Sequence, residues 1–354
     1  MPRHVLYYRY NDIFIQIWYI IFQKEKSESD EENQTTGEGK DMTTKSRVIK
    51  FDDKAKEIIK SRVPEEKDFP SVVLIDNISY CNLKCSMCFH KNMKREAGIM
   101  EWDLYKKIID EIAENNPNAQ IWVTFFGEGL MLKDLHERVK YARDKGLTNI
   151  ILNTNGNLIK PEKSKALIEA GLNGFYVGID AFKPETYEQI RVGGNLEKVT
   201  KGVLEYKKML DEFGKPDQKV VVQLVEMDIN ADELEDFVKF WHDEHGIQCK
   251  IRPMVSWAGK AGRQATNLKD VEDRLPCYWA MNTINITNVG DVALCSVDLD
   301  CAAPMGNIVN SSIKEVWNST LKEFRDNQRN GNWDKIPPMC QQCKDWQSGY
   351  AKYL

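Results

Sequence analysis

The stretch Cys81-Asn-Leu-Lys-Cys85-Ser-Met-Cys88-Phe89 brings three cysteines together with the spacing C-x3-C-x2-C. It follows an apolar run at residues 71–75 that is typical of a buried strand. Thiols this close on one loop, in a chain without an evident secretory signal, favour a soft metal or an iron–sulfur cluster over a disulfide framework. A cubane iron–sulfur cluster normally takes four cysteines, so three would leave one iron open to another ligand. A zinc loop, or three unrelated buried thiols, is the alternative interpretation.

Composition narrows the class of protein. The chain has 354 residues, 42% of them hydrophobic, which allows two domains or one barrel with an appendage. The net charge of −5 and the scattered basic residues argue against nucleic acid as a partner. Nine cysteines without an evident secretory signal indicate a reducing compartment, so we expect a cytoplasmic protein.

The first 41 residues differ from the rest of the chain. Residues 5–22 are apolar and aromatic, yet polar and charged residues interrupt them, so we expect no membrane span. Residues 24–40 are acidic and poor in apolar side chains, as in a disordered linker. We interpret residues 1–41 as a tail foreign to the catalytic fold and residues 42–70 as an extension of that fold. A short interfacial helix or a docking strand is the alternative for the tail.

Six β-branched runs alternate with amphipathic stretches, which is the pattern of βα units around a parallel sheet. We expect strands at residues 72–76, 121–126, 149–153, 174–179, 220–225 and 249–255. We expect helices at residues 101–114, 133–145, 161–170, 184–213 with a break at Gly193-Gly194, and 231–245. The fold class is therefore α/β, with a partial (β/α)6 barrel over residues 71–256 and functional residues at the carboxyl ends of the strands. The three-cysteine loop follows the first strand, as that rule requires.

Polar residues follow the next strands at the same end of the predicted barrel. Gly127 and Glu128 follow the second strand, where glycine allows close backbone approach and the carboxylate can accept from an ammonium group. Asn153 and Asp180 end the third and fourth strands, where their side chains can bond a ribose. Arg191 can bind a carboxylate through two parallel hydrogen bonds. Taken singly, each is also a common turn or surface residue.

The sixth strand supplies the two candidates for a catalytic role. Lys250 and Arg252 are two positions apart, so strand alternation directs both to one face, which can be the barrel interior. Either could steer a substrate or take part in proton transfer. A structural ion pair at the barrel rim is the alternative.

A second group of cysteines follows a connector at residues 257–276. Cys277 precedes two apolar runs joined by a Val-Gly-Asp turn, which predict a hairpin ending at Cys295. Cys340 and Cys343 form a C-x2-C pair after a helical stretch at residues 313–327.

Four thiolates from two segments can close a metal site that has no free position. We therefore expect a small α+β domain over residues 277–354. Zinc is the alternative occupant of this site, and Cys301 could replace one of the four ligands.

The cysteine loop, with Asn and Leu after its first cysteine and an aromatic residue after its last, resembles the signature of radical S-adenosylmethionine (SAM) enzymes. The resemblance implies a [4Fe-4S] cluster on Cys81, Cys85 and Cys88, with SAM at the open iron, where it is cleaved to a 5′-deoxyadenosyl radical. Gly127 and Glu128 match two positions of the family's Gly-Gly-Glu-Pro motif, which holds the amino group of SAM. Overall the resemblance implies SAM contacts from Met87, Phe89, Gly127, Glu128, Asn153, Asp180 and Arg191.

The second cysteine group resembles the short twitch form of the SPASM auxiliary-cluster domain, because the additional Cys-x5-Cys run of the full form is missing. The resemblance implies one auxiliary [4Fe-4S] cluster on Cys277, Cys295, Cys340 and Cys343. It also implies a flavodoxin or ferredoxin as electron donor and a small-molecule or peptide substrate. We expect a two-electron oxidation of a sugar or aminocyclitol alcohol. Modification of a ribosomal peptide or protein is the second expectation, and a non-catalytic iron–sulfur or zinc protein is the rival from another class.

Overall fold

The computed structural model describes residues 61, 63–215, 217–261 and 274–350 of the chain. Residues 63–268 and 275–348 form one compact unit, and its described part is the subject of all that follows. The other unit, residues 1–62, 269–274 and 349–354, lies almost wholly outside the described residues. The expected tail at residues 1–41 and most of the expected extension at residues 42–70 lie outside them too. In the part of the chain that is described, no helix has the length and hydropathy needed to cross a bilayer.

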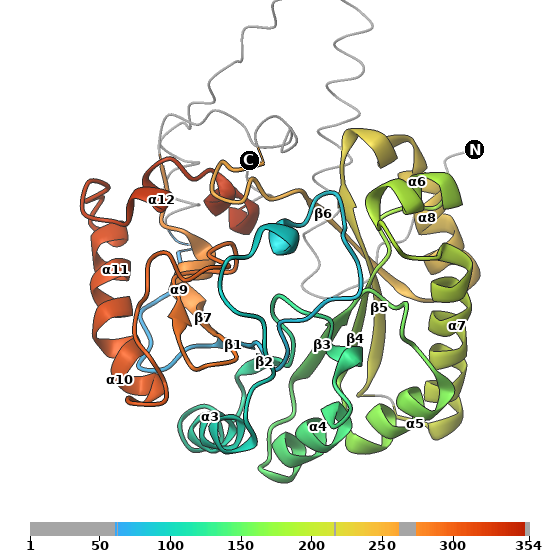
Figure 1. Ribbon diagram of the computed structural model, residues 1–354, viewed down its shortest axis with the longest axis horizontal. Coiled ribbons are helices and arrows are strands. Elements are labelled where there is room, and N and C mark those ends of the chain that lie inside the picture. Colours follow the sequence, from blue (N-terminus) through green and yellow to red (C-terminus); the bar gives the residue numbers. More distant parts are fainter. Residues whose placement is uncertain (1–60, 62, 216, 262–273, 351–354) are drawn as a thin grey trace, which may run out of the picture. The chain divides into compact units, whose positions relative to one another are not determined.

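One eight-stranded sheet organises the unit, in the order β6-β5-β4-β3-β2-β1-β7-β8 (Figure 1). Its first six strands run parallel to one another. They are β1 (Val72–Ile75), β2 (Gln120–Trp122), β3 (Ile150–Thr154), β4 (Gly174–Gly178), β5 (Lys219–Glu226) and β6 (Gln248–Pro253). The β7 strand (Thr283–Ile286) pairs parallel with β1, and β8 (Val292–Ala293) closes an antiparallel hairpin with β7.

Helices connect the strands and lie around the outside of the sheet (Figure 1). Between β1 and β6 they are α3 (Trp102–Asn115), α4 (Leu135–Asp144), α5 (Pro161–Ala170), α6 (Pro184–Ile190), α7 (Leu196–Phe213) and α8 (Leu234–Val238). Single turns are η1 (Phe89–Asn92), η2 (Gly129–Met131), η3 (Asp228–Glu233) and the π-helical η4 (Lys239–Glu244). The C-terminal part has α9 (Tyr278–Asn282), α10 (Ile313–Asn318), α11 (Thr320–Arg329), α12 (Pro338–Gln341) and η6 (Asp345–Tyr350).

Local sequence explains where these elements start and stop. The α5 helix begins with a proline in its first turn and ends at Gly171, whose φ of +87° gives the left-handed cap that glycine adopts without strain. The α7 helix begins at Asn195, whose side chain accepts from the amide of Lys198, directly after the expected break at Gly193-Gly194. The expected partial barrel of six βα units is confirmed.

Four elements differ from the prediction. The single helix expected at residues 231–245 is divided among η3, α8 and the π-helical η4. The β2 strand ends at Trp122, four residues early, because the chain then turns toward the cysteine loop and Glu128 donates its amide to Tyr80 O at 2.8 Å. The helix expected at residues 313–327 is two helices, because the backbone breaks at Ser319 (φ −114°, ψ −100°). The predicted hairpin is present, but its first strand also pairs with β1 and so continues the barrel sheet.

The two faces of the sheet differ in character. Alternate residues such as Val73 and Ile75 are fully buried and join the large core between sheet and helices. The opposite, inward face carries a separate small cluster of Ile151, Tyr176 and Val221, with Trp122 packed against it. Strand alternation places the polar residues of the inward face beyond this cluster, toward the carboxyl ends of the strands.

Candidate functional site

The cysteine loop leaves the carboxyl end of β1 and is held by the segment that follows α6. Lys84 donates its amide to Val192 O at 3.0 Å, and Ser86 donates its amide to Ile190 O at 2.8 Å. Burial raises the pKa of Cys81 to about 11; the amide of Leu83 opposes this, whereas the charges of Glu128, Cys85 and Cys88 add to it. The three sulfurs are therefore near enough to act on one another electrostatically.

Each of the three sulfurs has a hydrogen-bond donor from the protein. Arg191 Nη1 lies 3.6 Å from Cys85 Sγ, the amide of His90 lies 3.5 Å from Cys88 Sγ, and Asn155 Nδ2 lies 4.0 Å from Cys81 Sγ. Donors aimed at sulfur stabilise the thiolate form, which is the form that binds a metal. Burial raises the pKa of Cys81 and Cys88, and these donors offset part of that rise, so they would support thiolates once a metal is bound.

The three thiols of the loop form a donor set for a soft metal or an iron–sulfur cluster. All nine cysteines lie in the described residues, and no disulfide joins any of them. Among the residues described, no three His, Cys, Asp or Glu side chains converge where one metal ion could be held. Thiolates around one zinc ion lie about 4 Å from one another. In a cubane cluster each thiolate binds a different iron, so the sulfurs stand farther apart.

Gly127 fixes the next segment against the cysteine loop. A Cβ at this position would lie 1.9 Å from Ile78 O and 2.8 Å from Tyr80 O, so only glycine fits there. Glu128 is buried and accepts from Thr154 Oγ1 at 2.6 Å, from the amide of Asn155 at 2.7 Å and from the amide of Leu130 at 2.9 Å.

The carboxylate of Glu128 thus joins the turn after β2 to the end of β3. Burial raises its pKa, while the three donors lower it. A carboxylate can accept about four hydrogen bonds, so one acceptor position remains for an ammonium group. The expected amino group of SAM would donate to this fourth position.

Asp180 and Arg191, which the resemblance assigns to different parts of SAM, are paired with each other here. Arg191 Nη2 lies 2.5 Å from Asp180 Oδ2, and Asp180 Oδ1 accepts from the amide of Val225 at 2.6 Å. Burial alone would lower the pKa of Arg191, but the charges of Asp180 and Cys85 raise it. Gly178 makes room for the guanidinium, since a Cβ there would lie 2.1 Å from Nη2. The pair links the carboxyl end of β4 directly to the cysteine loop.

Asn153 lies on the inward face of β3. Its Oδ1 accepts from Gln223 Nε2 at 2.5 Å, which fixes the orientation of the amide. Its Nδ2 therefore points away from Gln223 and can donate to a ribose hydroxyl.

Met87 and Phe89 contact Trp257, a residue from the segment that follows the edge strand β6. Trp257, four residues after β6, donates its Nε1 to Met87 O at 3.0 Å, and its ring centroid lies 5.4 Å from that of Phe89. The backbone of Trp257 and Ala258 is left-handed, with φ of +53° and +55°. Non-glycine residues in this region are strained by roughly 1–3 kcal/mol each, so neighbouring contacts must hold them.

Asp345, two residues after Cys343, provides these contacts. Its carboxylate accepts from the amide of Ser256 and, at 2.9 Å, from the amide of Ala258, while its own amide lies 3.3 Å from Cys343 Sγ. The segment after β6 thus connects the second cysteine set to the loop of the first set.

Replacing Asp345 with asparagine is expected to weaken this connection. One acceptor oxygen becomes a donor, so one buried amide of the strained segment loses its partner at a cost of about 1–3 kcal/mol. Hydrogen exchange at residues 256–261 should rise, and SAM should bind more weakly because Met87 and Phe89 lose support. Asp217→Asn, which changes an exposed carboxylate at the amino-terminal end of β5, is the matched control. Unchanged exchange at residues 256–261 would contradict the role given to Asp345.

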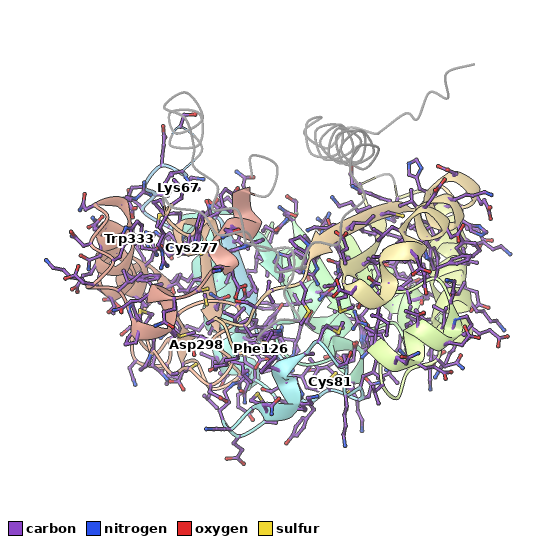
Figure 2. All side chains as sticks on the ribbon, turned by 90° about the horizontal axis from the view of Figure 1, so that it is seen from above. Lys67, Cys81, Phe126, Cys277, Asp298 and Trp333 are labelled. Atoms are coloured by element: carbon purple, nitrogen blue, oxygen red, sulfur yellow. The ribbon has the colours of Figure 1, made fainter. Side chains whose placement is uncertain are left out.

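The second cysteine set gathers around Cys295. Burial raises the pKa of Cys295 well above its ordinary range, and the nearby thiols of Cys340, Cys277 and Cys343 add to this effect. These thiols come from the turn before α9, the end of the hairpin and the C-terminal C-x2-C pair. In Figure 2, Cys277 of this set and Cys81 of the first set lie apart, with Phe126 labelled between them.

The two remaining cysteines have other surroundings. Cys301 lies among carboxylates, and after burial the charge of Asp298 contributes most to raising its pKa, to about 12. Cys249 Sγ, on β6, donates to the O atom of Ile247, the residue before that strand, at 3.8 Å. The other three thiols of the second set thus raise the pKa of Cys295, whereas carboxylates raise that of Cys301.

Lys250 and Arg252 both point to the inward face of β6. Lys250 Nζ lies 5.7 Å from the ring centroid of Tyr176, a member of the small inward cluster. Arg252 is near enough to Asp180 and Arg191 for their charges to act on it. The alternation predicted from the sequence thus places both side chains in the barrel interior.

Sequence reasoning missed Trp257, Asp345 and an anchor behind the cysteine loop. Arg95 lies 2.5 Å from Asp76 Oδ2 and also donates to Asn288 Oδ1 at 2.6 Å, so it ties the loop to the end of β1 and to the hairpin. The signal for Trp257 was its position just beyond the carboxyl end of β6, where a barrel carries its functional residues. Asp345 could have been identified from its position two residues after Cys343, a proposed cluster ligand.

Comparison with known families gives two matches along the chain. Residues 78–240 match the model of the radical SAM superfamily, and residues 277–344 match that of the SPASM iron–sulfur cluster-binding domain. The two matches include all seven cysteines of the two sets.

Similar proteins carry several names. A probable GTP 3′,8-cyclase of Methanococcus maripaludis is 37% identical over 124 residues, 35% of this chain and 41% of that protein. A tungsten-containing aldehyde ferredoxin oxidoreductase cofactor-modifying protein of Pyrococcus furiosus is 29% identical over 167 residues, 46% of this chain and 45% of that protein. The chain thus spans less than half the length of these relatives.

Two solved structures share the fold. BtrN in complex with AdoMet and 2-DOIA has a TM-score of 0.56 at 22% identity, covering 79% of this chain and 94% of that one. Streptococcus suis SuiB bound to precursor peptide SuiA has a TM-score of 0.59 at 15% identity, covering 94% of this chain and 84% of that one.

Proposed function

Because this chain is a member of the radical SAM superfamily of enzymes, with an iron–sulfur cluster-binding domain at its C-terminus, we propose that it oxidises a carbinol carbon of a sugar or aminocyclitol by two electrons. When bound, SAM and the clusters supply a 5′-deoxyadenosyl radical that removes hydrogen from carbon, and an acceptor for one further electron. We assign the SAM-bearing cluster to Cys81, Cys85 and Cys88, and one auxiliary cluster to Cys277, Cys295, Cys340 and Cys343.

The observation that carries this proposal is the gathering of four thiols around Cys295. Four protein thiolates complete the ligand set of a cubane cluster and leave no iron open to a substrate. The auxiliary site is therefore suited to electron transfer, and the substrate must be bound by side chains of the barrel interior. An alcohol that loses a hydrogen atom, one electron and the hydroxyl proton becomes a carbonyl. The electron that starts SAM cleavage would come from a flavodoxin or ferredoxin.

The residues of the first site have separate tasks in this proposal. Glu128 offers its remaining acceptor position to the amino group of SAM, and Arg191 offers its guanidinium to the carboxylate. In this proposal Asn153 donates to the ribose, and Met87 and Phe89 contact the adenosyl part. Asp180 is fully buried and paired with Arg191, so its task is to hold that guanidinium in place. Trp257 covers Met87 and Phe89 and so helps to exclude water from the radical.

Deuterium transfer tests the proposed reaction. The anaerobically reconstituted protein should be supplied with SAM, a flavodoxin system and a panel of sugars and aminocyclitols deuterated at each carbinol carbon. We expect one substrate to transfer deuterium into 5′-deoxyadenosine and to yield one carbonyl per 5′-deoxyadenosine formed. Deuterium transfer without any carbonyl product would contradict the two-electron oxidation.

A matched variant separates the two halves of the reaction. Cys343→Ser should remove the fourth auxiliary thiolate and leave the first site intact. We expect deuterium transfer to continue while carbonyl formation falls at least tenfold. If carbonyl formation is unchanged, the auxiliary site is not the electron acceptor.

Peptide modification remains the second candidate, since a structure with the same fold contains a bound precursor peptide. The neighbouring genes discriminate between the two. A short precursor-peptide reading frame favours a peptide substrate, and sugar or aminocyclitol genes favour the alcohol.

A further inference from the structure

Within the described part of the chain, Lys250 and Arg252 on the inward face of the barrel form no ion pair with a carboxylate, although the charge of Asp180 acts on Arg252. The strand register places Lys250 beside Gln223 and Arg252 beside Val225, so Arg252 lies one inward layer closer to the strand ends. Both residues lie on β6, the strand at the edge of the sheet, and each keeps a solvent-exposed part although its charged group is largely desolvated. Among the described residues, neither has an ion-pair or hydrogen-bond partner; Lys250 faces only the ring of Tyr176.

The carboxylates near this face are already engaged. Asp180 is paired with Arg191 at 2.5 Å, and Asp76 is paired with Arg95 at 2.5 Å. Glu128 is buried and accepts three hydrogen bonds. Glu226, at the end of β5, has the opposite parity to Val225 and so belongs to the other face of the sheet. The rim ion pair considered from the sequence is therefore absent within the described structure.

Electrostatics in the interior fit this excess of positive charge. Burial, followed by the charges of Arg252 and Lys219, lowers the pKa of Lys250 to about 8. Lys219 Nζ lies 6.0 Å from the centroid of the same Tyr176 ring that Lys250 faces. Holding like charges together costs free energy that an anion bound between them would recover.

We propose that Lys250 and Arg252 form an anion-binding subsite that holds a phosphate or carboxylate group of the substrate. The guanidinium of Arg252 matches the geometry of such a group through two parallel hydrogen bonds, and Lys250 adds a point charge one layer deeper. Arg252 lies close to Asp180 and Arg191. An anion held here therefore places the rest of the substrate beside the SAM contacts. That placement rests on the proposed function, whereas the binding of the anion does not.

Direct binding of simple anions tests the subsite. Inorganic pyrophosphate and malonate should be titrated separately by calorimetry into the reconstituted protein with SAM bound. We expect saturable binding of at least one of them, weakened by added sodium chloride. Binding of pyrophosphate indicates a phosphate subsite, and binding of malonate indicates a carboxylate subsite. Loss of a charged hydrogen-bonding partner costs about 1.5–3 kcal/mol, so Lys250→Met or Arg252→Met should each weaken binding roughly 10- to 100-fold.

Two further variants keep the test independent of folding. Arg252→Lys keeps the charge and should bind more tightly than Arg252→Met. Lys201→Met, on the solvent-exposed side of α7, is the matched control and should bind as the unchanged protein does. Iron content and SAM binding report whether each variant is intact. The subsite would be overturned if neither anion bound saturably. It would also be overturned if the Lys250→Met and Arg252→Met variants bound the anion as tightly as the unchanged protein does. Failure of deuterium transfer alone would overturn only the proposed reaction.

Discussion

Replacing Cys81, Cys85 and Cys88 together with alanine is expected to abolish SAM cleavage and to lower the iron content from about eight to about four atoms per chain. The three sulfurs lie on one loop, act on one another electrostatically and each have a protein donor. They share no ligand with the set around Cys295, so the auxiliary cluster should remain. Iron analysis and the yield of 5′-deoxyadenosine after anaerobic reconstitution measure both effects.

A single substitution outside the two sets is the control for this prediction. Cys249 donates to the backbone carbonyl of Ile247, just before β6, and should not bind iron. Cys249→Ala is therefore expected to keep about eight irons and full SAM cleavage. Loss of all iron from the triple variant, or retention of SAM cleavage by it, would contradict the assignment of the two sets. Bound zinc together with no SAM turnover in the unchanged protein would contradict a radical SAM enzyme.

Arg191→Met is expected to destabilise the protein by about 3–5 kcal/mol, because it leaves the carboxylate of Asp180 buried without a cation. Asp180 is fully buried and Arg191 is 13% exposed, so solvent screens this pair little. The same variant should weaken SAM binding at least tenfold, since the guanidinium is the proposed partner of the SAM carboxylate. Urea unfolding under anaerobic conditions and equilibrium binding of SAM measure the two effects separately.

The double variant Arg191→Met with Asp180→Asn distinguishes stability from binding. Asparagine tolerates the left-handed backbone of Asp180 (φ +66°) and can still accept from the amide of Val225. Without a buried charge, most of the lost stability should return, while SAM binding should stay weak. If SAM binding recovers together with stability, Arg191 has only a structural role.

Much of the fold follows from local sequence. All six strands from β1 to β6 were predicted, because β-branched runs alternate regularly with amphipathic stretches and glycine caps. The pairing of β7 with β1 was not predicted. Local periodicity identifies a strand and its hairpin partner, but it carries no information about a neighbour some 210 residues away in sequence.

Some features of the candidate site were also predicted from the sequence, and others were not. Cysteine spacing and strand ends predicted the thiol groups, Gly127 and the inward direction of Lys250 and Arg252. The pairing of Asp180 with Arg191 was not predicted, since each residue was assigned to SAM separately. The contacts of Trp257 and Asp345 run through backbone amides and carbonyls, which have no sequence signature.

The central claim is that Cys81, Cys85 and Cys88 hold a cluster with one iron open to SAM. The most direct test is the electron paramagnetic resonance spectrum of the reduced, reconstituted protein before and after SAM is added. We expect SAM to shift one of two cluster signals, and we expect the triple cysteine variant to lack this signal. A spectrum that SAM leaves unchanged, or a SAM-sensitive signal that persists in the triple variant, would contradict it.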